Sequence, residues 1–77
     1  EMVTVYTART CPYCTMVEQF LDQMSVSDKE VNLENDPEEA RKLVETTGEM
    51  GVPQTNIDGQ WVIGFDPETF LKYLPQQ

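Results

Sequence analysis

The spacing of hydrophobic positions changes along the chain, and each change marks the start of a different element. The segment from Val3 to Thr7 alternates apolar and polar side chains closely enough to predict a strand buried on at least one face. Thr10 is predicted to cap a helix that follows, and Pro12 suits the first turn of that helix. From there the apolar side chains recur at the spacing of one helix face, at Val17, Phe20, Leu21 and Met24.

The middle of the chain predicts a second strand and a second helix. Lys29 to Leu33 is a short run with several charges, which is typical of a strand at the edge of a sheet. Asp36 followed by Pro37 is a strong helix start, because Asp caps well and Pro is favoured at the first helical position. Gly48 is a suitable terminator. The side chains expected to be buried on this helix are Ala40, Leu43, Val44 and Thr47.

The last third of the chain predicts a hairpin and a final helix. Gln54–Ile57 and Trp61–Ile63 have the character of strands, and Asp58-Gly59 between them is a two-residue turn signal. Asp66 then caps a last helix that runs through Phe70, Leu71 and Leu74. The order β-α-β-α-β-β-α predicts one α/β domain over residues 1–77, with a four-stranded mixed sheet and three helices on its two faces.

The composition narrows the classes of partner. Fourteen Asp and Glu residues against five Lys and Arg residues give a net charge of −9, which argues against binding to nucleic acid or to an anionic membrane. No apolar run approaches the roughly 18 residues of a membrane span, and no basic segment followed by an apolar one indicates a secretory signal. Two cysteines are too few for a secreted disulfide scaffold, so we expect a cytoplasmic protein. We also expect it to be a monomer.

Cys11 and Cys14 are the only cysteines, and they stand where the first strand passes into the first helix. The unpaired N–H groups and the dipole of a helix start favour an anion, so we expect a lowered pKa for the Cys11 thiol. Cys14 lies one turn deeper, about 5–6 Å away, which is close enough for a disulfide. Such a pair breaks a substrate disulfide and then releases the product, which indicates dithiol–disulfide exchange.

Other chemistries fit the sequence less well. A cysteine pair also serves as a structural disulfide or as half of a zinc site, but this chain has no His and no third Cys to complete zinc coordination. We therefore expect no metal. The missing His also excludes a Ser–His or Cys–His nucleophile. The acidic residues around Asp36 lack the glycine that a calcium-binding loop requires.

Together these motifs resemble a glutaredoxin of the thioredoxin superfamily. The similarity is carried by Cys11-Pro12-Tyr13-Cys14 after the first strand, by Gly51-Val52-Pro53 before the hairpin, and by Gly64-Phe65-Asp66 after it. It extends from Val3 to Leu74. The resemblance implies a thioredoxin-like fold, a cis peptide bond between Val52 and Pro53, and a thiol–disulfide oxidoreductase. It also implies that no cofactor is tightly bound and that glutathione is a co-substrate.

Roles for individual residues follow from the cysteine motif and from the resemblance. Cys11 is expected to be the nucleophile and Cys14 the resolving thiol. Tyr13 offers a flat surface to a docking peptide. Arg9 offers a positive charge to the thiolate or to a substrate carboxylate, although many relatives carry their basic residue where Ala8 stands here.

Two further segments are expected to bind substrate. Val52-Pro53 exposes backbone groups with which an extended substrate segment pairs as an added strand. Gly64-Phe65-Asp66 corresponds to the turn that holds the γ-glutamyl ammonium of glutathione in relatives. Asp66 also has the simpler interpretation of a helix cap, and the turn departs from the family pattern at Ile63 and at Pro67.

Three functions remain open at this point. The first is a glutathione-coupled dithiol oxidoreductase that reduces protein disulfides and glutathione mixed disulfides. The second is a redoxin regenerated by a flavoprotein such as thioredoxin reductase, and donating electrons to an enzyme such as ribonucleotide reductase. The third, which Pro12 and the second cysteine disfavour, is a module that binds an iron–sulfur cluster through Cys11 and glutathione.

Overall fold

Residues 2–75 are described by the computed structural model, and they form the order of elements expected from the sequence pattern. The strands are β1 (Val3–Thr7), β2 (Lys29–Asn32), β3 (Gln54–Ile57) and β4 (Gln60–Ile63). The helices are α1 (Pro12–Gln23), α2 (Pro37–Thr47) and α3 (Pro67–Tyr73), with a short 3-10 turn, η1 (Leu33–Asn35), before α2. The second strand therefore ends one residue before its expected end, because Leu33 already belongs to η1.

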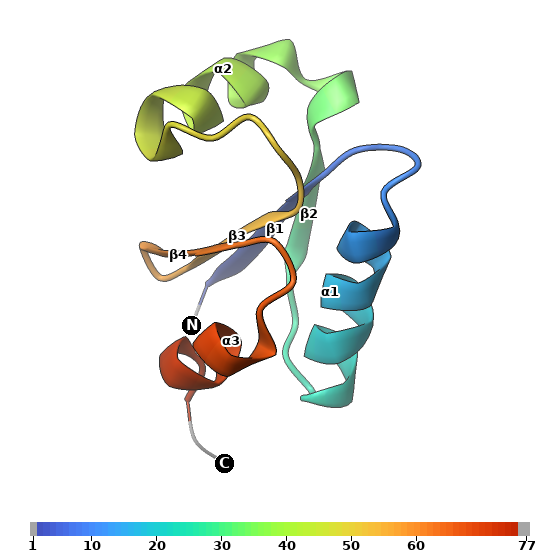
Figure 1. Cartoon of the computed structure of the whole chain (residues 1–77), viewed down its shortest axis with the longest axis vertical. Helices are drawn as coiled ribbons and strands as arrows, with labels where there is room; N and C mark the ends of the chain where they lie inside the picture. The colour runs from blue at the N-terminus through green and yellow to red at the C-terminus, as the bar shows by residue number, and fades with distance from the viewer. Residues whose placement is uncertain (1, 76–77) are drawn as a thin grey trace.

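The strands form one mixed sheet in the order β2-β1-β3-β4 (Figure 1). β1 runs parallel to β2 and antiparallel to β3, and β3 and β4 form an antiparallel hairpin. Parallel neighbours need a crossover connection, and α1 supplies it between β1 and β2. The expected thioredoxin-like arrangement of four strands and three helices is confirmed, and β2 lies at an edge as its charges indicated.

The main core lies between one face of the sheet and the helices α1 and α3. Alternate residues of β1, Val3 and Val5, point into it, which is why this strand shows a two-residue period. Full burial of one such side chain stabilises the fold by about 1.5–3 kcal/mol. The other members of the core are Val17, Leu21, Ile57, Val62, Phe70 and Leu74.

The helix α2 covers the opposite face of the sheet only in part. Leu43 is its single buried side chain among the described residues, and the expected burial of Val44 is wrong because that side chain is 37% exposed. An open hollow of about 430 Å³ lies beside Leu43, between α2 and the aromatic rings of Tyr6 and Trp61. The helix therefore packs on the sheet mainly through Leu43, and the adjacent Val44 faces solvent. Leu71 of α3 is exposed as well.

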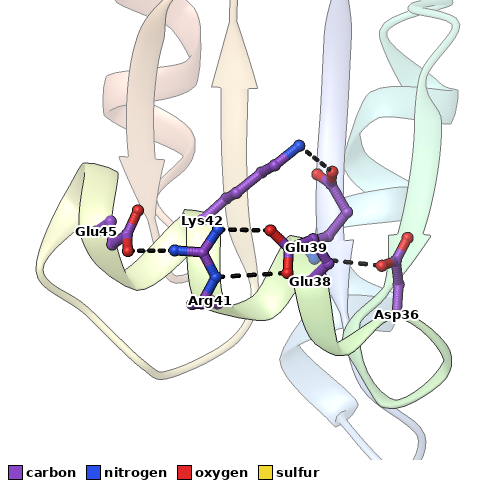
Figure 2. Close-up of polar contacts among 6 residues, drawn as sticks. All are labelled: Asp36, Glu38, Glu39, Arg41, Lys42 and Glu45. Atoms are coloured by element: carbon purple, nitrogen blue, oxygen red, sulfur yellow. Dashed lines mark hydrogen bonds and ion pairs between the residues drawn. The ribbon is translucent and has the colours of Figure 1, made fainter.

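Ion pairs link charged side chains along the exposed face of α2 (Figure 2). Arg41 pairs with both Glu38 and Glu45, and Lys42 pairs with Glu39, at the three- and four-residue spacing that brings side chains together. These exposed pairs contribute little stability, but they commit two of the five cations of the chain to carboxylates of their own helix.

Candidate active site

All three helices begin in the same way. In each case a capping residue is followed by Pro, and the capping side chain accepts a hydrogen bond from the backbone N–H three residues later. The three pairs are Cys11 Sγ with Cys14, Asp36 Oδ1 with Glu39, and Asp66 Oδ1 with Thr69, each at 3.2 Å. The sulfur of Cys11 therefore lies where the other two helices place a carboxylate, which is a position that stabilises an anion.

The residue that caps α1 is not the one predicted. Thr10 was the expected cap, but Cys11 caps the helix instead, with an extended backbone and its side chain directed at the N–H of Cys14. Thr10 has a φ of +50°, a left-handed conformation that is unfavourable for a β-branched residue. The turn from β1 into α1 thus includes a strained residue directly before the first cysteine, as is common at functional sites.

The charges near the start of α1 differ from those near the other helix starts. The first turn of α1 contains no acidic residue, whereas that of α2 contains Glu38 and Glu39 and that of α3 contains Glu68. A carboxylate beside Cys11 would compete with a thiolate for the positive end of the helix dipole. Its absence leaves the N–H groups of α1 available to a negatively charged sulfur.

Cys11 and Cys14 form a disulfide in this structure. Their Cα atoms are 5.2 Å apart, inside the range of about 4.4–6.8 Å that a disulfide needs. Cys14 is 4% exposed, while Cys11 is partly exposed at the helix start. The backbone therefore accommodates a disulfide between the two residues, and Cys11 is the one that an incoming disulfide can reach.

The topology brings the second predicted segment to the same end of the sheet. Tyr6 is paired with Gln54, and Gln54 with Ile63, so the end of β1, the start of β3 and the end of β4 lie side by side. The N–H of Gly64 donates to the carbonyl of Pro53 at 2.9 Å and continues this pairing by one residue. The Val52–Pro53 bond is cis, as the resemblance implied. Figure 1 shows that the chain from β1 into α1 leaves from this end too.

The turn after β4 uses its residues for packing and capping. Phe65 packs against the core with its ring 6.2 Å from that of Phe20, edge to face. Asp66 caps α3, and its second carboxylate oxygen accepts from the Thr69 hydroxyl at 2.7 Å. Those two hydrogen bonds, and then the charge of Lys72, hold the pKa of Asp66 below its ordinary value. The capping interpretation of Asp66 is confirmed, and glutathione contacts from this turn stay predictions.

Arg9 and Tyr13 lie on either side of Cys11 in the sequence and are both exposed. The backbone N–H of Arg9 donates to a carboxylate oxygen of Glu34 at 3.2 Å, which ties the turn before Cys11 to η1. Tyr13 is 61% exposed in the first turn of α1. Both side chains are accessible to a partner, and the binding roles proposed for them stay predictions.

The sequence pattern did not single out one buried polar residue beside the Val52-Pro53 segment. Gln54, directly after Pro53, is fully buried, and its amide nitrogen donates to the carbonyls of Glu49 and Gly51. Its position in a predicted strand next to the Val-Pro pair was a usable signal, because a polar side chain at an inward-facing position must find partners.

The described residues contain no cluster of three or more His, Cys, Asp or Glu side chains placed to hold a metal ion. Over the same part of the chain, no helix is long and apolar enough to cross a membrane.

Similarity to known proteins agrees with this geometry. A sequence model of the glutaredoxin family matches residues 3–62. Glutaredoxin 3 of Escherichia coli is 33% identical over 64 residues, which cover 83% of this chain and 77% of that protein. The glutaredoxin-like protein NrdH of Lactococcus lactis is 32% identical over 71 residues, which cover 92% of this chain and 97% of the relative.

A solved structure supports the same relationship. The crystal structure of the thioredoxin-like protein BC3987 has a TM-score of 0.86 to this chain at 30% sequence identity, covering 94% of this chain and 99% of the other. The family model spans most of the chain and includes both cysteines, which lie at disulfide distance. This chain therefore belongs to the glutaredoxin family and is a thiol–disulfide oxidoreductase.

Proposed function

We propose that this protein reduces protein disulfides and glutathione mixed disulfides, with Cys11 as the nucleophile and Cys14 as the resolving thiol. The observation that carries the proposal is the position of Cys11. Its sulfur caps α1 as a carboxylate would, and it accepts from the N–H of Cys14 at 3.2 Å. A thiolate is the reactive form in disulfide exchange, and a helix start stabilises it.

The reaction has two exchange steps. The Cys11 thiolate attacks one sulfur of the substrate disulfide, so a bond between Cys11 and that sulfur forms while the substrate bond breaks and the other sulfur leaves as a thiolate. Cys14 then loses its proton and attacks the Cys11 sulfur. This step releases the second substrate thiol and leaves the Cys11–Cys14 disulfide. Two electrons pass from the enzyme to the substrate. Of the two protons on the released thiols, one comes from Cys14 and the other from solvent, which took up the proton of Cys11 when its thiolate formed.

A glutathione mixed disulfide offers a shorter route. Cys11 attacks the glutathione sulfur and releases the protein thiol, and a second glutathione molecule then reduces the glutathionylated enzyme. The products are the protein thiol and oxidised glutathione, and Cys14 takes no part. Glutathione as co-substrate is supported by the similarity to glutaredoxins and by the exposure of Cys11.

Substrate binding is proposed around these sulfurs. An extended segment of the substrate pairs with the backbone of Val52, beside Pro53. Arg9 attracts a carboxylate of the substrate, and Tyr13 packs against its chain. Contacts from Gly64 and Asp66 to the γ-glutamyl ammonium complete the site proposed for glutathione.

Two cysteine variants test the roles of the thiols. Replacing Cys11 by Ser removes the nucleophile and should abolish reduction of every disulfide substrate. Replacing Cys14 by Ser should spare the reduction of a glutathionylated peptide while it abolishes reduction of an intramolecular protein disulfide. NADPH consumption, coupled through glutathione and glutathione reductase, measures both reactions. Full activity of the Cys11→Ser variant would contradict the proposal.

A second candidate is a redoxin that receives electrons from a flavoprotein such as thioredoxin reductase. Its support is the similarity to NrdH over 92% of this chain, together with the environment of Asp66. Both carboxylate oxygens of Asp66 accept hydrogen bonds from Thr69, so a glutathione ammonium would have to compete with them. Ile63 and Pro67 also replace residues typical of the glutathione-binding turn.

The two electron donors are separated in one assay. Reduction of the same protein disulfide is followed by NADPH consumption, once with glutathione and glutathione reductase and once with thioredoxin reductase alone. Activity only in the first arm supports the leading proposal. Activity only in the second identifies a reductase-dependent redoxin, with an enzyme such as ribonucleotide reductase as a partner.

We also propose that the protein works as a monomer in the cytoplasm. A reducing compartment supplies the electrons that return the Cys11–Cys14 disulfide to the dithiol, and it suits a chain in which these are the only cysteines. Light scattering at micromolar concentration tests the monomer, and alkylation of thiols in intact cells tests the redox state. A stable dimer or a fully oxidised pair in cells would contradict these two statements.

A further inference from the structure

Gln54 occupies an unusual position for a polar side chain. It is the first residue of β3, follows Pro53 directly, and is 0% exposed. Its amide nitrogen donates to the carbonyl of Gly51 at 2.8 Å and to the carbonyl of Glu49 at 3.0 Å. Both protons of the amide are therefore used on the loop between α2 and β3, which leads into Val52-Pro53.

The cost of burying this amide is only partly offset. Its oxygen, Oε1, is buried and has no hydrogen-bond partner among the described residues. A buried unpaired acceptor destabilises a protein, so an apolar side chain of the same size would suit packing better. Gln54 differs from an apolar side chain in the two hydrogen bonds that its amide nitrogen donates. Both of these hydrogen bonds hold the loop.

The bond to Gly51 has a consequence for Val52. The carbonyl of Gly51 and the N–H of Val52 belong to one planar peptide unit, in which the two groups point in opposite directions. That unit is trans, since the one cis bond among the described residues lies between Val52 and Pro53. Gln54 is buried and holds the carbonyl toward itself. The N–H of Val52 is therefore directed away from Gln54.

Among the described residues, the other hydrogen bonds of this loop lie at its beginning and at its last residue, Pro53, whose carbonyl accepts from the N–H of Gly64. The N–H of Glu49 donates to the hydroxyl of Thr47 at 3.1 Å, and Gly48 closes α2 in a left-handed conformation. Met50 is 81% exposed, and the space where a side chain on Gly51 would stand is empty. Among the described residues, Gln54 is the side chain that hydrogen-bonds Gly51.

We propose that Gln54 is a positioning residue for substrate recognition: it fixes the Gly51–Val52 peptide so that the Val52 N–H is presented to the backbone of a substrate. This inference rests on the proposed function, because it assigns a device to the strand-like pairing at Val52. The buried amide of Gln54 would thus affect substrate binding without contacting the substrate.

A matched pair of variants tests the inference. Gln54→Met keeps the length of the side chain and removes both donors. Thr55→Val, at the next residue, removes a buried hydroxyl that has no partner among the described residues, and so it leaves the two hydrogen bonds from Gln54 to the loop in place. We expect Gln54→Met to raise the KM for a glutathionylated peptide about fivefold or more, as expected for losing a hydrogen bond, while kcat stays within about twofold. Thr55→Val should leave both constants unchanged.

Two further readouts separate positioning from general damage. The alkylation rate of Cys11 by iodoacetamide should be the same in wild type and Gln54→Met, because the start of α1 is not altered. The ¹⁵N order parameters of Gly51 and Val52 should fall from about 0.85 in wild type to below about 0.6 in Gln54→Met. Rigid Gly51 and Val52 amides in a folded Gln54→Met protein, or an unchanged KM, would overturn the inference.

A measurement without any change at Gln54 covers the case in which Gln54→Met does not fold. The Cys14→Ser variant is trapped as a mixed disulfide between Cys11 and a cysteine-containing peptide, and hydrogen exchange of the Val52 amide is compared with that of the free variant. Slower exchange in the trapped form is the expected result, and unchanged exchange overturns the inference. Failure to form the mixed disulfide at all would instead refute the proposed function, so the two failures are distinguishable.

Discussion

Cys11 occupies at the start of α1 the position that Asp36 occupies at the start of α2. Each side chain accepts from the backbone N–H three residues later at 3.2 Å, and each is followed by Pro. The redox motif is thus a helix cap in which a sulfur has replaced a carboxylate. A thiolate at Cys11 satisfies an N–H group that would otherwise be unpaired, and the same hydrogen bond stabilises the reactive form of the thiol.

This equivalence predicts the behaviour of a Cys11→Asp variant. An Asp at position 11 should cap α1 as Asp36 caps α2, so the variant should exceed Cys11→Ala in free energy of unfolding by about 1 kcal/mol. Urea denaturation of both proteins under reducing conditions measures the difference. Both lack disulfide exchange, and neither can form the Cys11–Cys14 bond, so the comparison is matched in redox state. Equal stability of the two variants would refute the capping role.

The hydrogen bonds of Asp66 predict a pH dependence of stability. Because Thr69 and then Lys72 lower the pKa of Asp66 in the folded protein, the folded state favours the ionised carboxylate. This stabilisation is present above about pH 4 and is lost as the pH falls through the ordinary pKa and below. Asp66→Asn keeps one acceptor but does not titrate. The melting temperature of wild type should therefore exceed that of Asp66→Asn at pH 7, and the gap should narrow below pH 4; a constant gap would contradict this assignment.

Ionisation of Glu18 should lower the stability of the fold, whereas ionisation of Asp66 raises it. Burial, and then the charges of Glu30 and Asp28, raise its pKa in the folded protein. The folded state therefore binds a proton at Glu18 more tightly than the unfolded state does, so the ionised carboxylate destabilises the fold above the raised pKa. Glu18→Gln should raise the melting temperature at pH 7, with a gain that declines as the pH falls toward 4. Glu49→Gln, which changes the net charge equally at an exposed loop position, is the control and should give a smaller gain.

The burial of Leu43 and the exposure of Val44 predict unequal losses of stability when each is replaced by Ala. Leu43→Ala should lower the free energy of unfolding by about 2–5 kcal/mol, because Leu43 is the one side chain of α2 that is buried among the described residues. Val44→Ala, at the adjacent and exposed position, should change it by no more than about 0.5 kcal/mol. Chemical denaturation of both variants provides the comparison. Similar losses for the two would mean that Val44 is buried after all.

Two glycines beside the Val52-Pro53 segment should respond differently to Ala. Gly48 has a φ of +75°, so Gly48→Ala should destabilise the protein by about 1–2 kcal/mol. Gly51 has no positive φ and open space at its Cβ position, so Gly51→Ala should be neutral or stabilising by up to about 1 kcal/mol. Thermal unfolding of the oxidised proteins distinguishes the two. A loss of stability in Gly51→Ala would show that the loop needs more freedom than its conformation indicates.

Local sequence signals were sufficient for the elements and for part of the site. The two-residue period of Val3–Thr7, the helical period after Pro12, and the Asp-Pro and Asp-Gly pairs each act through neighbouring residues, so they predicted the strands, the helix starts and the hairpin. The same holds for Cys11 and Cys14, which are three residues apart at a helix start and therefore lie close enough for a disulfide. The cis bond before Pro53 was expected only through the resemblance to glutaredoxins.

What the sequence determined by itself, then, is the set of elements and the redox pair, because both depend on contacts within a few residues. Tertiary structure decided which face of α2 is buried and that the side chain of Gln54 lies inside the fold. Both depend on where separate segments lie relative to one another, such as the pairing of Tyr6 with Gln54 across 48 positions of the chain. The cap of α1 is a local contact, but residue type alone did not distinguish Cys11 from Thr10. Patterns along a chain record which residues prefer the interior, but not which distant groups they will find there.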